Sequence, residues 1–236
     1  LLAMTVATMA MEVIPLDMAP DSFDDQYQGC GPAMKAELWA LNRSEFQKNL
    51  LFAKIWSEAV KEWQTLGSPV SPLSSSGQAI AIMAYTVDGL YKQFNHDVRV
   101  FGRSPQEYWD HFHFKTLHFL LTDALATLRD AQGQQCHCVF RGVDNYKFEA
   151  NVVDIFRFRQ FVWSWFCENI EYSWTTVFKV RTCHGADIKK FTRFADWKEV
   201  LIPPFEKFNM TKVMEKGTSV EIHLNSIGTY SKYNCE

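Results

Sequence analysis

The sequence predicts an α+β fold, in which a helical part is followed by a part made of strands. Apolar residues recur at helical spacing up to about residue 130. From Cys136 onward, runs of β-branched and aromatic residues replace this pattern, as is typical of buried strands. Helices followed by strands, rather than alternating with them, favour α+β architecture over repeated βαβ units.

The first two helices are expected on either side of a loop rich in Gly, Ser and Pro. Ser44 can cap a helix over Glu45–Leu66, where apolar side chains recur at i, i+3 and i+4. The loop covers residues 67–76, and a second helical stretch, Gln78–Phe94, follows with a break near Gly89. A third helix is expected from the Ser104-Pro-Gln-Glu107 capping box to Arg129, with one apolar side.

The strand part delivers an arginine and a glutamate from separate strands. Strands are expected at Cys136–Gly142, Val152–Phe158, Thr175–Thr182 and Lys198–Pro204. In the first of them Arg141 precedes Gly142, and Glu199 lies at the start of the last. A guanidinium binds phosphate through a fork of donors, and a glycine lets the backbone approach a ligand closely. The two strands therefore predict a cleft for a phosphate-bearing substrate.

Length and composition fit a single soluble domain of 236 residues. A net charge of −3 gives no electrostatic footprint for nucleic acid. No stretch beyond the N-terminus has the ~18 apolar residues of a membrane span. Leu1–Ala10 is interpreted as the remnant of a secretory signal, with an apolar strand as the alternative, and residues 11–236 as one domain.

Several long motifs occur in a fixed order: VFRGV, then RF-x-QF, RTCHGADI and KEVLIPPFE. Together with SFDDQYQGC near the start and YNCE at the end, they resemble the vertebrate, avian-like arginine-specific ecto-ADP-ribosyltransferases. The resemblance implies a helical portion at about 35–132 and two facing, mainly antiparallel sheets at about 136–235 that form an NAD cleft. It also implies NAD or NADP as substrate, a protein arginine as acceptor, no metal, and a secreted or cell-surface location. We expect a monomer.

Six cysteines suit an oxidising compartment, and they allow fifteen pairings. The resemblance implies Cys30 with Cys235 and Cys136 with Cys183, which leaves Cys138 and Cys167 unassigned. Sequons at Asn42 and Asn209 are compatible with glycosylation in the same compartment.

Two residue groups could suggest a metal site, and neither is favoured. The spacing of His111, His113 and His118 does not gather three imidazoles on one helix face. Cys136-His137-Cys138 is short, and its first cysteine has a better partner in Cys183.

The resemblance assigns roles to individual residues. Arg141, Gly142, Tyr85 and Gln160 match positions that contact NAD in the family. Glu199 matches the catalytic glutamate directly before VLIPP. A carboxylate there can stabilise the ribosyl cation that forms as nicotinamide leaves.

Two tryptophans depart from the family pattern. Trp163 stands where the first serine of Ser-x-Ser is expected, and Ser164 takes the middle position. Strand alternation points Ser164 to the opposite face, so only a bulge or register slip would bring it to Glu199 as the catalytic hydroxyl. Trp197 replaces the acidic residue two positions before Glu199. Tyr172 or Trp174 could stack on the nicotinamide ring, although packing is the alternative.

The motifs and the two tryptophans together leave two alternative functions for this protein. The first is an NAD-dependent arginine mono-ADP-ribosyltransferase, or an enzyme reduced to NAD glycohydrolase activity. The second is a catalytically inactive family member that acts as a secreted or surface binding or antigen protein, with its cleft blocked by Trp163 and Trp197.

Overall fold

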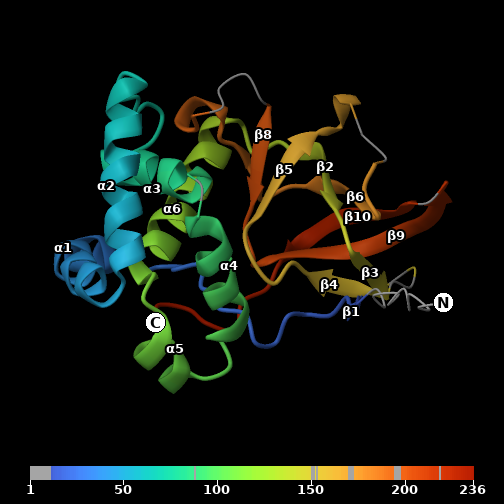
Figure 1. The fold of residues 1–236 in the computed structure, drawn as a ribbon, viewed down its shortest axis with the longest axis horizontal. Coiled ribbons are helices and arrows are strands. Elements are labelled where there is room, and N and C mark those ends of the chain that lie inside the picture. Colours follow the sequence, from blue (N-terminus) through green and yellow to red (C-terminus); the bar gives the residue numbers. More distant parts are fainter. Residues whose placement is uncertain are drawn as a thin grey trace, which may run out of the picture.

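The computed structural model describes residues 12–87, 89–149, 152, 154–169, 173–193, 198–217 and 219–236. A helical half is followed by a strand half (Figure 1), which confirms the α+β class. The expected leader, Leu1–Ala10, lies outside the described residues.

The helices are α1 (Gly31–Lys48), α2 (Leu50–Thr65), α3 (Ser76–Thr86), α4 (Leu90–Val100), α5 (Pro105–His111) and α6 (Lys115–Ala131), with short 3₁₀ turns η1 (Cys167–Asn169) and η2 (Lys189–Phe191). The strands are β1 (Glu12–Pro15), β2 (His137–Val143), β3 (Tyr146–Glu149), β4 (Ile155–Arg157), β5 (Val162–Phe166), β6 (Thr176–Thr182), β7 (Ala186–Asp187), β8 (Glu199–Ile202), β9 (Glu206–Lys216) and β10 (Ser219–Thr229).

The first helices begin elsewhere than the sequence predicts. Ser44 does not cap a helix, because it lies inside α1, which starts directly after Cys30. Asn49 separates α1 from α2, and its side chain accepts a hydrogen bond from the Phe52 N–H at 3.0 Å. Asn49 is therefore the cap of α2. The break expected near Gly89 is confirmed, since this residue separates α3 from α4.

The helix expected to start at Ser104 is two helices, α5 and α6. Ser104 caps α5 by accepting a hydrogen bond from the Glu107 N–H. At the start of α6, the Glu45 carboxylate of α1 accepts hydrogen bonds from the backbone N–H groups of Lys115 and Thr116. These groups have no partner within their own helix, and a carboxylate there also complements the helix dipole. The capping residue thus comes from a distant helix.

Eight strands form one hydrogen-bonded sheet in the order β4-β9-β10-β6-β2-β5-β8-β7, and β1 pairs with β3 in a separate ribbon. Most neighbours are antiparallel, while β6 and β10 run parallel. The ladder between β2 and β5 consists of the pairs Val139–Phe166 and Phe140–Trp165. Beyond this ladder, β2 remains paired with β6, and β5 remains paired with β8. The two facing sheets are thus two halves of one sheet that part directly before Arg141, a point we call the fork.

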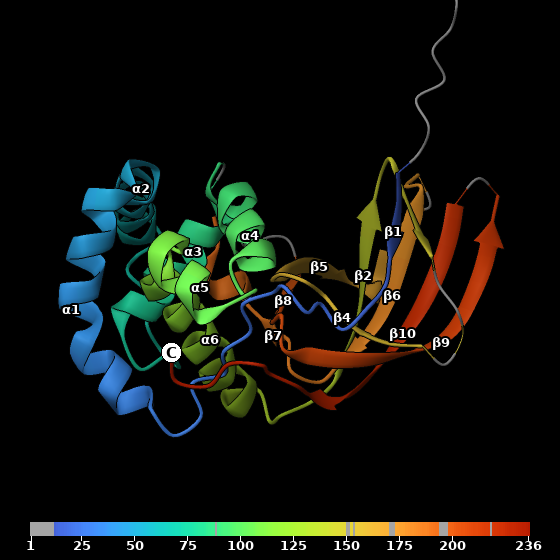
Figure 2. The same cartoon turned by 90° about the horizontal axis from the view of Figure 1, so that it is seen from below.

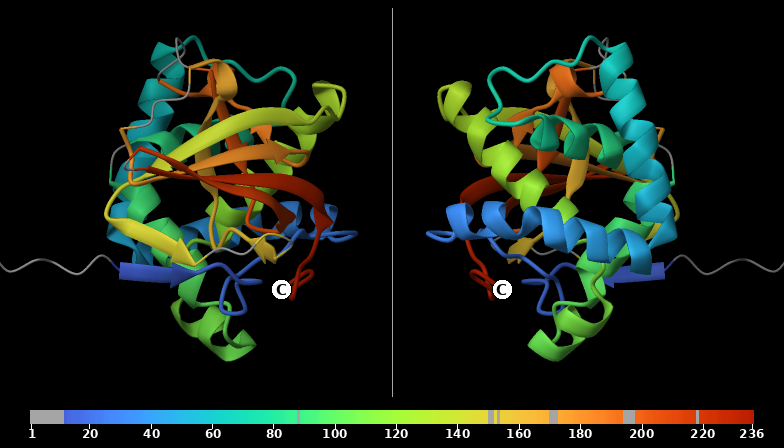
Figure 3. Two further views of the ribbon diagram at one scale, coloured as in Figure 1. Left: turned by 90° about the vertical axis from the view of Figure 1, so that its right-hand side faces the viewer. Right: turned by 90° about the vertical axis from the view of Figure 1, so that its left-hand side faces the viewer.

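The strands β5 and β8 separate two hydrophobic clusters. Val162, Val200 and Ile202 pack in the cluster inside the strand half. Leu201 packs in the other cluster with the helices, and Trp163 lies against it. Seen along the long axis, α1 and α2 cover one end of the molecule and β9 and β10 cross the other (Figure 3). Each residue of β5 and β8 therefore faces either the helices or the sheet interior.

Three disulfides connect distant parts of the chain. The C-terminal segment returns from β10 to the helices (Figure 2), where Cys235 bonds to Cys30. Cys136 bonds to Cys183, so both predicted pairs are confirmed. The cysteines left unassigned form a third bond, Cys138–Cys167, between β2 and the turn after β5. It holds β2 and β5 together beside their short ladder.

A buried ion pair joins both ends of the described chain to the sheet. Arg157 of β4 lies 2.6 Å from Asp24, and their side chains are 1% and 0% exposed. The same guanidinium donates hydrogen bonds to the backbone carbonyls of Met18, Pro204 and Tyr230. The pair therefore fixes three separate segments.

Candidate active site

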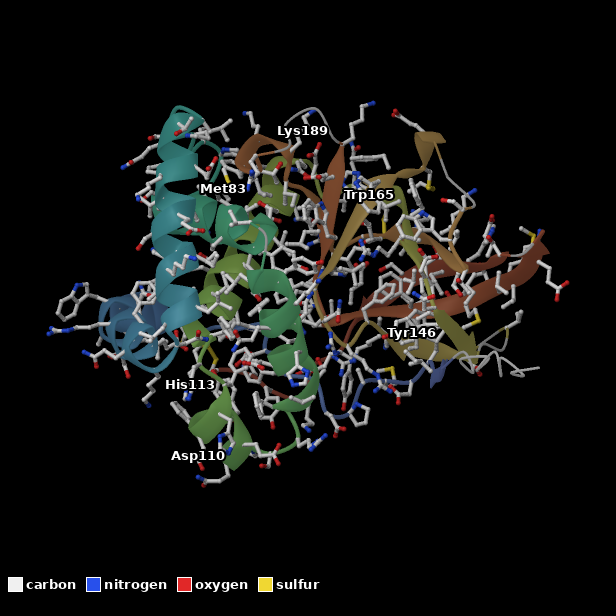
Figure 4. The ribbon with its side chains drawn as sticks, viewed as in Figure 1. Met83, Asp110, His113, Tyr146, Trp165 and Lys189 are labelled. Atoms are coloured by element: carbon white, nitrogen blue, oxygen red, sulfur yellow. A yellow bond between two sulfur atoms is a disulfide. The ribbon has the colours of Figure 1, made fainter. Side chains whose placement is uncertain are left out.

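Arg141 lies at the fork, one residue past the last β2–β5 pair. Its guanidinium donates a hydrogen bond to the Trp163 carbonyl of β5 at 3.2 Å. It also lies 5.5 Å from the ring centroid of Trp165, within cation–π distance. Trp165 is labelled on β5 in Figure 4. Arg141 thus spans the gap between the two halves of the sheet.

A pocket of about 430 Å³ opens beside Arg141 and is also lined by Gln160. This volume is within the range of small-molecule sites. Its wall carries aromatic rings, among them Tyr146 and Phe148 of β3 and Phe158 after β4. Tyr146, labelled in Figure 4, belongs to the strand half. The structure therefore brings two of the predicted NAD contacts, Arg141 and Gln160, to one pocket.

Two further arginines, which the sequence analysis did not select, line this pocket: Arg99 of α4 and Arg159. Arg159 is paired with Asp17 at 2.6 Å. Arg99 donates a hydrogen bond to the Gln160 side-chain oxygen. Within the part of the chain that the structure describes, neither Arg99 nor Arg141 forms an ion pair with a carboxylate. The pocket can therefore receive an anion such as a pyrophosphate.

Arg159 had a signal in the sequence, and Arg99 had none. Arg159 stands next to Gln160 in the RF-x-QF motif, so it could have been selected with it. Arg99 lies in a helix whose position against the sheet no sequence pattern reveals.

Glu199, the first residue of β8, is almost completely buried, with 2% of its surface exposed. Burial raises the pKa of its carboxyl group to about 7, because a charge is less stable away from water. The nearby side chains of Thr192 and Trp163 lower the pKa in part, and the negative charge of Asp187 raises it further. Glu199 can therefore change its charge near neutral pH.

Ser164 is not brought to Glu199. Its hydroxyl donates a hydrogen bond to the Val200 carbonyl at 2.8 Å, and its side chain is fully buried. Ser164 pairs with Val200, and Trp165 pairs with Glu199, so the register contains neither a bulge nor a slip. Ser164 faces the sheet interior and Glu199 faces the helices, which excludes a direct contact.

Tyr85 does not line the pocket either. It is 1% exposed, and its hydroxyl donates to the Phe161 carbonyl at 3.1 Å. The Asn95 amide donates to the same hydroxyl at 3.0 Å. Tyr85 therefore holds the chain just before β5, and its influence on a ligand would be indirect.

Gly142 is covered by Trp174. A methyl group added at Gly142 would overlap the Trp174 indole, so the glycine permits this indole to pack on the backbone of β2. Trp174 therefore occupies the close approach that the sequence analysis reserved for a ligand. Tyr172 and Trp197 lie outside the described residues.

The described ranges contain no group of three or more His, Cys, Asp or Glu side chains arranged to hold a metal ion. His118, one of the three histidines considered for this role, is buried, and burial lowers its pKa to about 3. Within the same ranges, no helix has the length and apolar character needed to cross a membrane.

Comparison with known proteins assigns the chain to a family. The family model described as NAD:arginine ADP-ribosyltransferase matches residues 16–232. The chain belongs to the NAD:arginine ADP-ribosyltransferase family.

Relatives and solved structures agree with this assignment. The chain is 46% identical to the erythroblast NAD(P)(+)–arginine ADP-ribosyltransferase of Gallus gallus, over 94% of this chain and 76% of the relative. It is 40% identical to the GPI-linked NAD(P)(+)–arginine ADP-ribosyltransferase 1 of Homo sapiens, over 94% and 74% of the two chains. The crystal structure of the eucaryotic mono-ADP-ribosyltransferase ART2.2 has a TM-score of 0.80 and 33% identity, over 94% and 98% of the two chains. A variant of ART2.2 in complex with NAD has a TM-score of 0.78.

Within the NAD:arginine ADP-ribosyltransferase fold, this chain places its two principal candidates on different sides of the fork. Arg141 faces the pocket together with Gln160. Glu199 lies on β8 and faces the helices, next to the indoles of Trp163 and Trp165. A substrate that contacts both residues must therefore extend from the pocket across the fork.

The pH dependence of catalysis is expected to follow Glu199. Only the ionised carboxylate can stabilise a developing cation, so nicotinamide release should rise with pH and level off above the carboxyl pKa of about 7. A kcat profile between pH 5 and 9 measures this. A profile already flat at pH 5 would show that Glu199 titrates at its ordinary value and that its burial is relieved when substrate binds.

Proposed function

We propose that this protein transfers ADP-ribose from NAD(P)+ to arginine side chains of proteins and releases nicotinamide. The principal support is the position of Arg141, which spans the fork beside a pocket that Arg99 also lines. Within the described residues, neither guanidinium forms an ion pair with a carboxylate. Two guanidinium groups match the charge of one pyrophosphate. The aromatic wall of the pocket offers flat surfaces to a nucleobase.

The reaction breaks the bond between ribose C1′ and the nicotinamide nitrogen. The electron pair leaves with nicotinamide, and the ribose carbon becomes cationic. The Glu199 carboxylate stabilises this charge, while Arg141 and Arg99 hold the pyrophosphate. An arginine nitrogen of the acceptor then attacks C1′ and loses a proton, or water attacks and gives free ADP-ribose.

Hydrolysis is expected to exceed arginine modification in the natural chain. Trp197 replaces the acidic residue that would orient and deprotonate a guanidinium, which is a poor nucleophile while charged. Water needs no such orientation. The measurement compares nicotinamide release with the formation of ADP-ribosyl-agmatine, for the natural chain and for Trp197→Glu. The variant should move the ratio towards agmatine, and Trp163→Ser combined with Trp197→Glu should show whether a serine adds to this effect.

An equal yield of both products from the natural chain would contradict this account of Trp197.

The second candidate function, an inactive binding or antigen protein, is favoured by the burial of Glu199 and by the indole packed on Gly142. Titration calorimetry with NAD separates the two functions from each other. Absence of binding at millimolar NAD would reject the enzyme.

We also propose an extracellular location, a monomeric state, and a single domain over residues 11–236. The three disulfides support an oxidising compartment. Relatives in mouse and human are named GPI-linked, and one in rat is named an ecto-ADP-ribosyltransferase. Secretion and attachment to the cell surface are both compatible with these observations.

A further inference from the structure

Trp163 and Glu199 lie on the same face of adjoining strands. In the β5–β8 ladder, Trp165 is opposite Glu199 and Trp163 is opposite Leu201. Trp163 is therefore the diagonal neighbour of Glu199, at a separation that long aromatic side chains can cover. Its indole packs against the same hydrophobic cluster as Leu201, on the helical side.

Thr192 lies near the same carboxyl group, on a different segment of the chain. It follows η2 directly, and its side chain is fully buried. The segment that carries it is fixed to β8, because the Ile188 N–H donates to the backbone carbonyl of Glu199 at 3.0 Å. Thr192 thus approaches Glu199 from the turn beyond β7, and Trp163 approaches it from β5.

A buried carboxylate needs hydrogen-bond donors, since it has lost those of water. Within the part of the chain that the structure describes, Glu199 Oε2 and Thr192 Oγ1 are buried and have no hydrogen-bond partner. The Thr192 hydroxyl and the Trp163 indole are the nearby side-chain donors that lower the pKa of Glu199. Their chemistry differs. A threonine hydroxyl can donate or accept, whereas an indole N–H can only donate. The indole therefore favours the ionised carboxylate, because it cannot accept a hydrogen bond from the O–H of the carboxylic acid.

We propose that the Trp163 indole N–H, together with the Thr192 hydroxyl, positions and stabilises the Glu199 carboxylate for ribosyl transfer. This inference rests on the proposed function. It gives Trp163 the task that a serine hydroxyl would perform at this position. Ser164 is excluded because its hydroxyl is bound to the Val200 carbonyl on the other face. Trp163 is then a positioning residue and not an obstruction.

The charged surroundings of Glu199 set the direction of the pH effect. Asp187 of β7 disfavours the ionised carboxylate, as does burial, while the two donors oppose both effects. The neighbouring Lys198 is paired with Glu168 at 2.8 Å. Removal of a donor must therefore raise the pKa of Glu199 further, and more alkaline conditions would be needed to ionise it.

Trp163→Phe keeps an aromatic ring and removes the N–H. We expect kcat for nicotinamide release to fall about 5-fold at pH 7, with little change in KM for NAD. The acidic limb of the pH profile should move up by about one pH unit, so the rate recovers towards the natural value at pH 9. Thr192→Val should change kcat and the pH profile in the same direction as Trp163→Phe. Thr192→Ser keeps a hydroxyl and should retain the kcat and pH profile of the natural protein. Trp109→Phe, at an exposed tryptophan of α5, is the matched control.

A second measurement does not depend on activity. Carbon-13 NMR of protein labelled at glutamate carboxyl groups, with Glu199→Gln to assign the signal, reports the pKa of Glu199 directly. Trp163→Phe should raise it. An unchanged Glu199 titration would overturn the inference, as would a loss of activity that is equal at every pH. If the natural protein releases no nicotinamide, the proposed function fails, whereas the NMR titration still decides whether Trp163 acts on Glu199.

Discussion

Glu199→Gln is expected to lower the rate of nicotinamide release by about 10²–10³-fold. The amide has nearly the same shape as the carboxyl group but carries no negative charge towards the ribosyl cation. Arg141, Gln160 and the pocket are unaffected, so the affinity for NAD should change little. Both products, free ADP-ribose and ADP-ribosyl-agmatine, should decline together, because both form after the same bond has broken. Steady-state kinetics at pH 8, with NAD affinity from calorimetry, check this result.

Stability provides the control for this variant. The pKa of Glu199 lies near 7 in the folded protein and nearer 4.5 when exposed, so its favourable contribution is full below pH 4.5 and is lost as the pH rises to about 7. Glutamine never ionises, and Glu199→Gln should therefore melt at the same or a higher temperature than the natural protein at pH 8. Glu168→Gln, at an exposed carboxylate paired with Lys198, should leave the rate unchanged. A Glu199→Gln variant with natural activity would show that another group stabilises the cation.

Asp24→Asn is expected to destabilise the fold by about 3–5 kcal/mol. It leaves the Arg157 guanidinium, which is 1% exposed, without the charge that compensates it. The Asp24 carboxylate also accepts backbone hydrogen bonds from Lys232 and Tyr233, so the C-terminal segment loses an anchor as well. Denaturant unfolding of the disulfide-bonded protein measures the loss.

Asp17→Asn is the matched control, because it removes the equivalent charge from the Arg159–Asp17 pair, whose side chains are 38% and 39% exposed. Such a pair contributes about 0–1 kcal/mol, since water screens it. Equal losses from Asp24→Asn and Asp17→Asn would mean that burial does not decide the strength of these pairs.

The sequence predicts the order of helices and strands, two disulfides and the position of Arg141, because each depends on local pattern or on motif order. It also predicts that Ser164 turns away from Glu199, since strand alternation is a local property and the register is regular. What it misses depends on contacts between distant segments. Glu45 caps a helix that begins some seventy residues later, and no spacing rule connects the two.

The candidate site shows the same limit. Thr192 and Arg99 carry no motif, and only the packing of η2 and α4 brings them to Glu199 and to the pocket. The indole of Trp174 on Gly142 is a further example, because Gly142 reads as a ligand contact until its neighbour in space is known. The interpretation of Ser164 as the catalytic hydroxyl is wrong for the same reason, because its hydroxyl donates to the Val200 carbonyl on the other face.

The three disulfides also set a sequence of events during biosynthesis. Cys138–Cys167 and Cys136–Cys183 enclose separations of 29 and 47 residues, whereas Cys30–Cys235 spans 205. Short loops close with a smaller loss of chain entropy. Cys30 also leaves the ribosome long before its partner, and four other cysteines are synthesised between the two. A nascent chain paused after β6 can thus form a non-native bond to Cys30, and disulfide isomerisation during oxidative folding would then be needed for a high yield of native protein.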